Sequence, residues 1–201
     1  MIAIIDYDAG NLASVEKAFK KIGEDVVVSR DSAEILSADR VVLPGVGAFG
    51  DAMDKLQGYG LVDTIKQAAA SGKPFLGICL GLQLLFENSE ESPGVKGLCI
   101  EKGKIIRIPD KEGLKIPHIG WNDLEINPKS RLFRGLPEKP YVYFVHSYYL
   151  KAENEAEVAA TTEYSAHIHA AFESGNVFAT QFHPEKSGDV GLAILKNFAG
   201  I

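Results

Sequence analysis

Cysteine is scarce in this chain of 201 residues, which contains only Cys79 and Cys99. Two cysteines cannot form the disulfide framework of a small secreted protein, so we expect reduced thiols and a cytoplasmic location. The first residues contain neither a basic segment nor a long apolar segment, so we expect no signal peptide. No apolar run approaches the roughly 20 residues of a membrane-spanning helix, and we expect no membrane partner.

Basic charge is also scarce. The 21 Lys and Arg residues are outnumbered by 27 Asp and Glu residues, which gives a net charge of −6. No cluster of Lys and Arg stands out, so we expect no nucleic-acid partner.

Hydrophobic residues make up 46% of the chain, an ordinary share for a globular protein. The sequence contains no internal repeat or linker, and we expect residues 1–201 to form a single domain.

The first half of the sequence alternates strand-like and helix-like segments. Apolar residues recur at steps of three and four between 12 and 22, which predicts a helix that Asn11 caps and Gly23 ends. Further helices are expected at about 51–58, 61–71 and from 82 onward, and strands at 1–6, 26–28, 40–43 and 75–79. This alternation predicts an α/β fold with a doubly wound, mostly parallel central sheet and flanking helices.

The second half of the sequence is rich in strands. Strand-like segments at 104–108, 141–145, 157–161, 167–172 and 177–182 predict additional antiparallel strands, and a last helix is expected at about 192–198. His167 and His169 share one face of a strand, but no cluster of cysteines or carboxylates accompanies them. We therefore expect a solvated strand and no metal site. Cys99 has no base near it in the sequence and is interpreted as structural.

An apolar strand ends at Cys79, which lies between Gly77 and Gly81. At a sharp strand-to-helix turn, side chains two residues before and after a nucleophile would collide with neighbouring backbone, and glycine removes these clashes. The free N–H groups at the start of the next helix favour a thiolate. The same groups, beginning with that of Leu80, can stabilise an oxyanion. The segment therefore predicts a nucleophilic cysteine, although a small buried cysteine is the ordinary alternative.

A candidate base lies in the segment His183-Pro184-Glu185. Proline favours an extended conformation at the preceding residue, and residues two apart in extended backbone face the same way. We therefore expect His183 and Glu185 to project together, with the carboxylate fixing the imidazole tautomer. The alternative is a histidine and a glutamate exposed after a strand.

A glycine-dense loop, residues 44–50, follows the third expected strand. Ligands of open parallel sheets bind at the carboxyl ends of the strands, where such a loop can bring backbone N–H groups close to a substrate oxygen. The loop has neither the Gly-Lys-Ser/Thr ending of a phosphate-binding loop nor the context of a dinucleotide site. An ordinary turn remains the alternative for this loop alone.

These three segments, in this order, resemble class I (triad-type) glutamine amidotransferase domains over nearly the whole chain. The resemblance implies that Cys79 is the nucleophile, His183 the general base and acid, and Glu185 its orienting partner. It places the oxyanion hole at Val46, Gly47 and Leu80. It also implies that the substrate L-glutamine is held by Gln83, His146, Ser147 and Tyr148. No cofactor is implied.

Residues 6–11, 117–122 and 143–148 narrow the resemblance to the glutaminase subunits of imidazole glycerol phosphate synthases. The resemblance implies hydrolysis of glutamine through a cysteinyl thioester. It also implies a heterodimer in which ammonia passes to a (β/α)8-barrel cyclase subunit, for imidazole glycerol phosphate formation in histidine biosynthesis. Asn11, Trp121 and Lys186 match positions that face the cyclase. The chain length fits a glutaminase domain without a synthetase domain.

Several alternatives stay open on the sequence. The same chemistry would serve the glutaminase of anthranilate, guanylate or pyridoxal phosphate synthesis. A non-catalytic binding protein on the same fold, a cysteine peptidase and a redox-sensing thiol protein are further possibilities. For the amidotransferase, weak activity without the partner is implied, and we expect the peptide between Val46 and Gly47 to flip on activation, because glycine tolerates either orientation.

Overall fold

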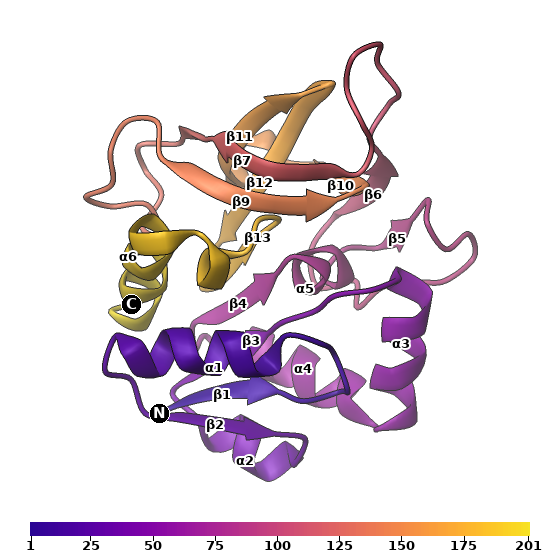
Figure 1. Ribbon diagram of the computed structural model, residues 1–201. Helices are drawn as coiled ribbons and strands as arrows, with labels where there is room; N and C mark the ends of the chain where they lie inside the picture. Colours follow the sequence, from indigo (N-terminus) through magenta and orange to yellow (C-terminus); the bar gives the residue numbers. More distant parts are fainter.

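A sheet of eleven strands runs through the molecule and is covered by helices in its first half (Figure 1). The computed structural model describes the whole chain, from Met1 to Ile201. One half of the sheet is parallel, in the spatial order β2 (Val26–Ser29), β1 (Ile2–Ile5), β3 (Arg40–Leu43), β4 (Phe75–Ile78) and β13 (Val177–Thr180). Strands β1 to β4 form the parallel sheet that the alternating sequence predicts. Strand β13 was expected among the antiparallel strands, but it pairs with β4 in parallel and only with β12 in antiparallel.

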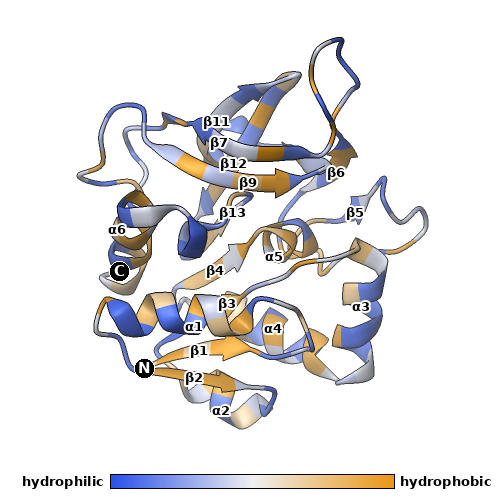
Figure 2. Ribbon diagram, viewed as in Figure 1, coloured by the Kyte–Doolittle hydropathy of each residue, from blue (hydrophilic) through white to orange (hydrophobic).

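Helices bury both faces of the parallel half. One face packs against α1 (Leu12–Lys21) and α6 (Gly188–Ala199). The other packs against α2 (Ser32–Ser37), α3 (Phe49–Gly58), α4 (Leu61–Ala70) and α5 (Leu80–Leu84). Side chains of β3 alternate between the two cores, with Val41 and Leu43 on one side and Val42 on the other. Strand β1, which is fully buried, has the hydrophobic colour along its length in Figure 2.

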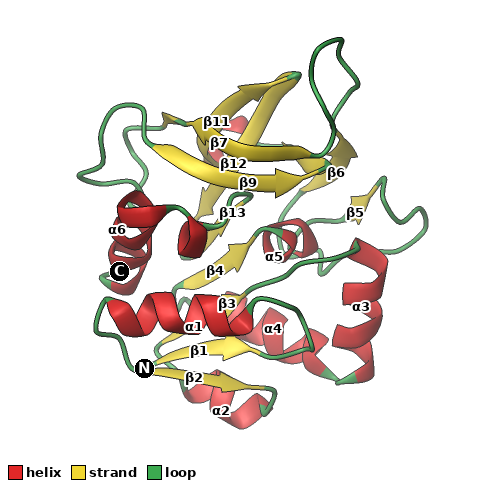
Figure 3. Ribbon diagram, in the orientation of Figure 1, coloured by secondary structure: helices red, strands yellow, loops and turns green.

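Antiparallel strands dominate the other half of the molecule (Figure 3). The large sheet continues from β13 through β12 (Ala166–Ser174), β10 (Tyr148–Ala152), β6 (Gly103–Arg107) and β5 (Asn88–Ser89), of which β5 pairs with β6 in parallel. Two further strands complete this sheet: β11 (Val158–Tyr164) pairs with β12, and β8 (Glu125–Ile126) pairs with β11. A separate two-stranded sheet joins β7 (His118–Asp123) to β9 (Tyr141–His146). Short 3-10 turns occur at η1 (Glu155–Glu157) and η2 (Pro184–Lys186).

The predicted fold class is confirmed, and the sequence analysis missed short elements. Helix α2 escaped it because the helix has six residues and buries only Ile35 fully, which is too short for a periodic pattern. Asn11 is the N-cap residue of α1, as predicted, but its side chain makes no capping hydrogen bond. Its backbone is left-handed, with φ of 77°, and its side chain donates to Glu185 instead.

One smaller interpretation was wrong. His169 is not solvated: it is 9% exposed, and its Nδ1 accepts a hydrogen bond of 3.2 Å from the Ala152 N–H. Only its neighbour His167 is exposed, beside Glu163. The side chain of Cys99 is exposed and its backbone has φ of 52°, and the interpretation of this residue as structural stays a prediction. No helix of the structure has the length and apolar character needed to cross a bilayer.

The parallel strands bring three distant sequence segments together. Strands β3, β4 and β13 are neighbours and run in the same direction, so their carboxyl ends share one edge of the sheet. The segment 44–47 follows β3, Cys79 follows β4, and residues 181–185 follow β13. The site is therefore positioned by strand pairing.

Candidate active site

Cys79 lies at a strained turn between β4 and α5. Its φ and ψ of 55° and −108° lie outside the ordinary regions for an L-residue. The turn is closed by flanking glycines: a Cβ on Gly77 would lie 2.8 Å from the Gly81 carbonyl oxygen, and a Cβ on Gly81 only 1.9 Å from that of Leu43. The packing therefore requires glycine at both positions, as the sequence predicts.

A buried imidazole–carboxylate pair lies beside Cys79. The Nδ1 atom of His183 is 2.7 Å from Oε1 of Glu185, and the side chains are 1% and 0% exposed. Asn11 donates to the same carboxylate oxygen. With Nδ1 donating to the carboxylate, Nε2 is left facing the cysteine, and it has no hydrogen-bond partner in the structure.

The predicted juxtaposition of His183 and Glu185 is present, but the reason given for it was wrong. The backbone is extended only at His183, and Pro184–Lys186 form a 3-10 turn. Lys186 N–H donates to the His183 carbonyl at 3.0 Å, and the Ser187 hydroxyl donates to it at 2.6 Å. This tight turn, rather than the two-residue period of a strand, folds the carboxylate back onto the ring.

The electrostatics of the pair favour a charged imidazole. Burial lowers the pKa of His183, but the adjacent Cys79 sulfur and the Glu185 carboxylate outweigh it and raise that pKa to about 10. Tyr7 is a second titratable side chain near Cys79. Burial and the proximity of Cys79 raise the pKa of Tyr7 well above its ordinary value. Tyr7 therefore stays neutral and donates to the Pro44 carbonyl at 2.9 Å.

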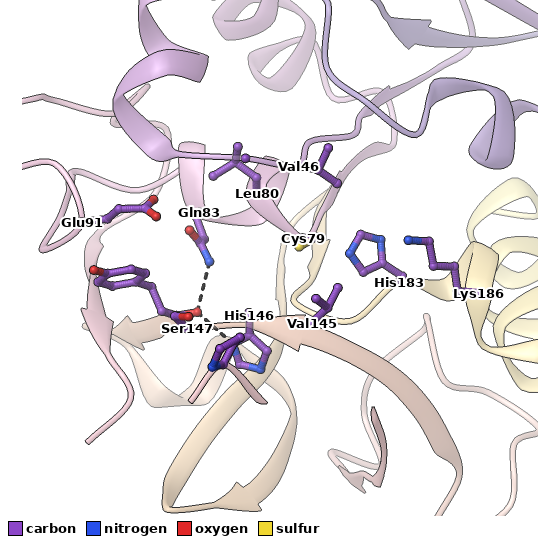
Figure 4. Close-up of a pocket in the computed structure, with 13 residues that line it drawn as sticks. Val46, Cys79, Leu80, Gln83, Glu91, Val145, His146, Ser147, His183 and Lys186 are labelled. Carbon is purple, nitrogen blue, oxygen red and sulfur yellow. Dashed lines mark hydrogen bonds between the residues drawn. The ribbon is translucent and has the colours of Figure 1, made fainter. Parts of the chain in front are cut away.

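A cavity of about 390 Å³ opens over the cysteine (Figure 4). Its volume suits a small molecule. The residues around it come from α5, β9, β10, η2 and the loops between elements, and Cys79 and His183 lie close together in its wall. Of the residues singled out in the sequence, it is lined by Val46, Gly47, Cys79, Leu80, Gln83, His146, Ser147, Tyr148, His183 and Lys186. Glu185 lies behind His183.

The two expected oxyanion donors differ in their surroundings. The Leu80 N–H donates to the Gly45 carbonyl over a long distance of 3.3 Å. Gly47 has φ of 103°, in the left-handed region that favours glycine, and Val46 before it is 38% exposed. In this conformation one predicted donor is thus engaged by the neighbouring loop.

The three residues expected to face a partner differ in their exposure. Trp121 is 56% exposed on β7 and is therefore not part of the core. Ile119 and Tyr141, also more than half exposed, lie on the same two-stranded sheet. Lys186 is exposed and lines the cavity, whereas Asn11 is half-buried against Glu185.

Two buried polar residues at the site, Gln181 and His118, were not predicted from the sequence. Gln181 is fully buried, and its Nε2 lies 3.8 Å from the Cys79 sulfur. It opens the segment Gln-Phe-His-Pro-Glu, and a polar residue at the end of a buried strand was the available signal. His118 lies 3.1 Å from His146, Nδ1 to Nε2, and its ring stacks on Tyr164. Burial lowers the pKa of His118 to about 4 and that of His146 to about 3.

The fold and the paired Cys79 and His183–Glu185 define the class, and comparison with known proteins agrees. The family model of class-I glutamine amidotransferases matches residues 3–200, and the chain belongs to this family. It is 55% identical to the imidazole glycerol phosphate synthase subunit HisH of Methanothermobacter thermautotrophicus, over 100% of this chain and 98% of the relative. The HisH protein of Syntrophotalea carbinolica is 52% identical, with 98% of each chain covered.

Solved structures share the fold at low sequence identity. A crystal structure of a glutamine amidotransferase superposes with a TM-score of 0.76 at 20% identity and covers 100% of both chains. The structure of PurLQS from Thermotoga maritima gives a TM-score of 0.70 at 21% identity, with 99% of this chain and 97% of the other covered. At this identity the likeness concerns the fold alone.

Proposed function

We propose that this chain is the glutaminase subunit of an imidazole glycerol phosphate synthase. It hydrolyses glutamine and delivers the ammonia for imidazole glycerol phosphate formation in histidine biosynthesis. The observation that carries the proposal is the Cys79–His183–Glu185 arrangement, at a cavity large enough for an amino acid. Relatives that bear the HisH name match the chain from end to end, which favours this acceptor over those of anthranilate, guanylate or pyridoxal phosphate synthesis.

The first chemical step is attack of the Cys79 sulfur on the side-chain carbonyl carbon of glutamine. We propose that His183 takes the thiol proton so that sulfur attacks as a thiolate, which the raised pKa of His183 favours. The carbonyl π electrons move to oxygen and give a tetrahedral oxyanion. Glu185 holds the imidazolium in place through Nδ1 and leaves Nε2 directed at the reacting atoms.

Collapse of the tetrahedral intermediate releases ammonia. The Nε2 proton of His183 transfers to the amide nitrogen as the carbon–nitrogen bond breaks, leaving a glutamyl thioester on Cys79. A water molecule then gives a proton to the neutral imidazole and attacks the thioester, and thiolate departs as glutamate forms. Gln83, His146, Ser147 and Tyr148 line the space beside the sulfur and are proposed to hold the rest of the glutamine.

The oxyanion requires donors that this conformation only partly offers. The Leu80 N–H is engaged by the Gly45 carbonyl at 3.3 Å, a bond long enough to yield to a charged oxygen. Val46 and Gly47 are proposed to supply the second donor after their peptide turns. Losing one such donor typically costs about 3–4 kcal/mol in the barrier, so the loop 44–47 is proposed to restrain turnover.

The ammonia needs a protected route, because in water it protonates and loses its nucleophilicity. The HisH relatives are named as subunits of a synthase, which supports a partner subunit for this chain. We propose a cyclase with a (β/α)8 barrel, docked where Asn11, Trp121 and Lys186 lie. Exposed Trp121 is the proposed anchor, since buried aromatic side chains dominate many interfaces.

A glutamate-release assay tests this function. The wild-type chain is measured alone, with the cyclase, and with the cyclase together with its nucleotide ligand. Release is expected to rise when both are present and to vanish in Cys79→Ala, whereas the matched control Cys99→Ala keeps it, because Cys99 lies outside the cavity. Release that is indifferent to the cyclase and its ligand would point to another amidotransferase. Release that survives Cys79→Ala would overturn the proposed chemistry.

A further inference from the structure

A chain of hydrogen bonds leads from a backbone carbonyl to the sulfur of Cys79. The Tyr148 carbonyl accepts from Gln83 Nε2 at 3.1 Å. Gln83 Nε2 also lies 3.1 Å from Gln181 Oε1, and Gln181 Nε2 lies 3.8 Å from Cys79 Sγ. Gln83 and Gln181 are 5% and 0% exposed, so little water competes for these contacts.

Donor and acceptor chemistry fixes the direction of this chain. The Tyr148 carbonyl is an acceptor only, so the group of Gln83 that faces it must be the NH2 group. The second hydrogen of that NH2 group then requires an acceptor, which is the side-chain oxygen of Gln181. The NH2 group of Gln181 is consequently turned away from Gln83 and toward Cys79. The Tyr148 carbonyl therefore sets the orientation of the Gln181 amide beside Cys79, through the side chain of Gln83.

Two histidines, His146 and His118, help to hold the Tyr148 carbonyl in place. Nδ1 of His146 lies 2.9 Å from the Tyr148 carbonyl, so it must carry a proton and donate. Its Nε2 is then an acceptor, which receives the Nδ1–H of His118 at 3.1 Å. Because the carbonyl oxygen has two lone pairs, it accepts from both His146 and Gln83. The carbonyl is held in place by β10 and by the His118–His146 pair behind it.

We propose that Gln181 stabilises the Cys79 thiolate by donating an N–H···S hydrogen bond, with its amide oriented by Gln83 and the Tyr148 carbonyl. His183 supplies positive charge to the sulfur, and Gln181 adds a neutral donor that is not consumed during the reaction. A fixed dipole aimed at a buried charge needs no reorganisation when that charge forms. Gln181 therefore favours the reactive thiolate before substrate arrives and again when the thioester breaks.

The inference rests on the proposed role of Cys79, and it is tested without glutamine turnover. The rate of alkylation of Cys79 by iodoacetamide is followed against pH, with the modified peptides quantified by mass spectrometry. Exposed Cys99 is the internal reference in every sample. The titratable groups around the sulfur are His183 with Glu185 behind it, Tyr7, His146, Lys186 and Glu91, and the variants below leave all of them unchanged.

Gln181→Met keeps the size of the side chain and removes the donor. We expect the midpoint of the Cys79 pH profile to rise by about one pH unit, a tenfold change in the thiol–thiolate equilibrium or about 1.4 kcal/mol. Gln181→Glu replaces the donor with a carboxylate and is expected to raise the midpoint further. Thr180→Val is the matched control at the neighbouring position, because the Thr180 hydroxyl donates to the Phe182 carbonyl at 3.1 Å and not to the sulfur.

A second variant covers the case in which Gln181 substitutions prevent folding. Gln83→Leu removes the donor that orients the Gln181 amide, and we expect a smaller rise in the same midpoint. Midpoints that match the wild type in every folded Gln181 and Gln83 variant would overturn the inference. That result would leave the proposed glutaminase intact, which fails separately if Cys79→Ala still releases glutamate.

Discussion

Gly81→Ala adds a methyl group where the backbone leaves no room. The new Cβ would lie 1.9 Å from the Leu43 carbonyl oxygen, whereas real Cβ contacts almost never fall below 3.0 Å. Relief therefore requires a movement of about 1 Å between β3 and the start of α5. Both sides of the contact are backbone, and Leu43 is paired with Gly77 of β4, so neither side yields by a change of rotamer.

We expect this variant to lose about 3 kcal/mol of unfolding free energy, the upper end of the usual overpacking cost. We also expect glutaminase activity to fall by about 100-fold or more, because a displacement near 1 Å misplaces the nucleophile. The control is Gly58→Ala at the end of α3, where a Cβ meets nothing within 4 Å. Urea unfolding and glutamate release measure the two effects. A Gly81→Ala protein with wild-type stability and activity would refute the packing argument.

Two further predictions concern the partner and acid pH. Trp121→Ala is expected to weaken cyclase binding by about 2 kcal/mol, or roughly 30-fold in Kd, and an unchanged Kd in calorimetry would contradict the anchor role. His118 and His146 have folded-state pKa values below the ordinary 6.5, so the unfolded chain takes up protons first as the pH falls. The unfolding free energy should therefore decrease from about pH 6.5 toward pH 4, by at most about 1.4 kcal/mol per pH unit for each histidine. In His118→Asn the slope should be shallower, and a stability that stays flat over this range would count against the buried neutral pair.

The sequence predicts the parts of the site that local patterns carry. A strand that ends in Gly-Ile-Cys-Leu-Gly indicates an elbow without knowledge of the rest of the chain, and the structure shows why both glycines are needed. Alternating strands and helices indicate that β3 and β4 are parallel, but they did not indicate β13, which was expected among the antiparallel strands and pairs with β4 in parallel. These features brought Cys79, His183 and the loop 44–47 to one edge of the sheet.

Other parts of the site depend on packing that no local pattern records. Gln181 reaches the sulfur only because β13 pairs with β4 in a register that sets Thr180 opposite Ile78. Strand β7 was not predicted because its pattern is reversed: His118 is buried, while Ile119 and Trp121 face outward. Two apolar side chains that face outward suit a surface that another protein covers. Strand prediction assumes that apolar residues face the core, so it does not find such a strand.

Capture of the acyl intermediate tests the central claim most directly. The enzyme, turning over glutamine with its cyclase partner, is quenched rapidly in acid, and its cysteine-containing peptides are weighed by mass spectrometry. We expect a glutamyl adduct on the peptide of Cys79 and none on that of Cys99, and we expect the adduct to disappear in His183→Ala. Sustained turnover with unmodified Cys79 at every quench time, together with glutamate release by Cys79→Ala, would contradict the covalent mechanism.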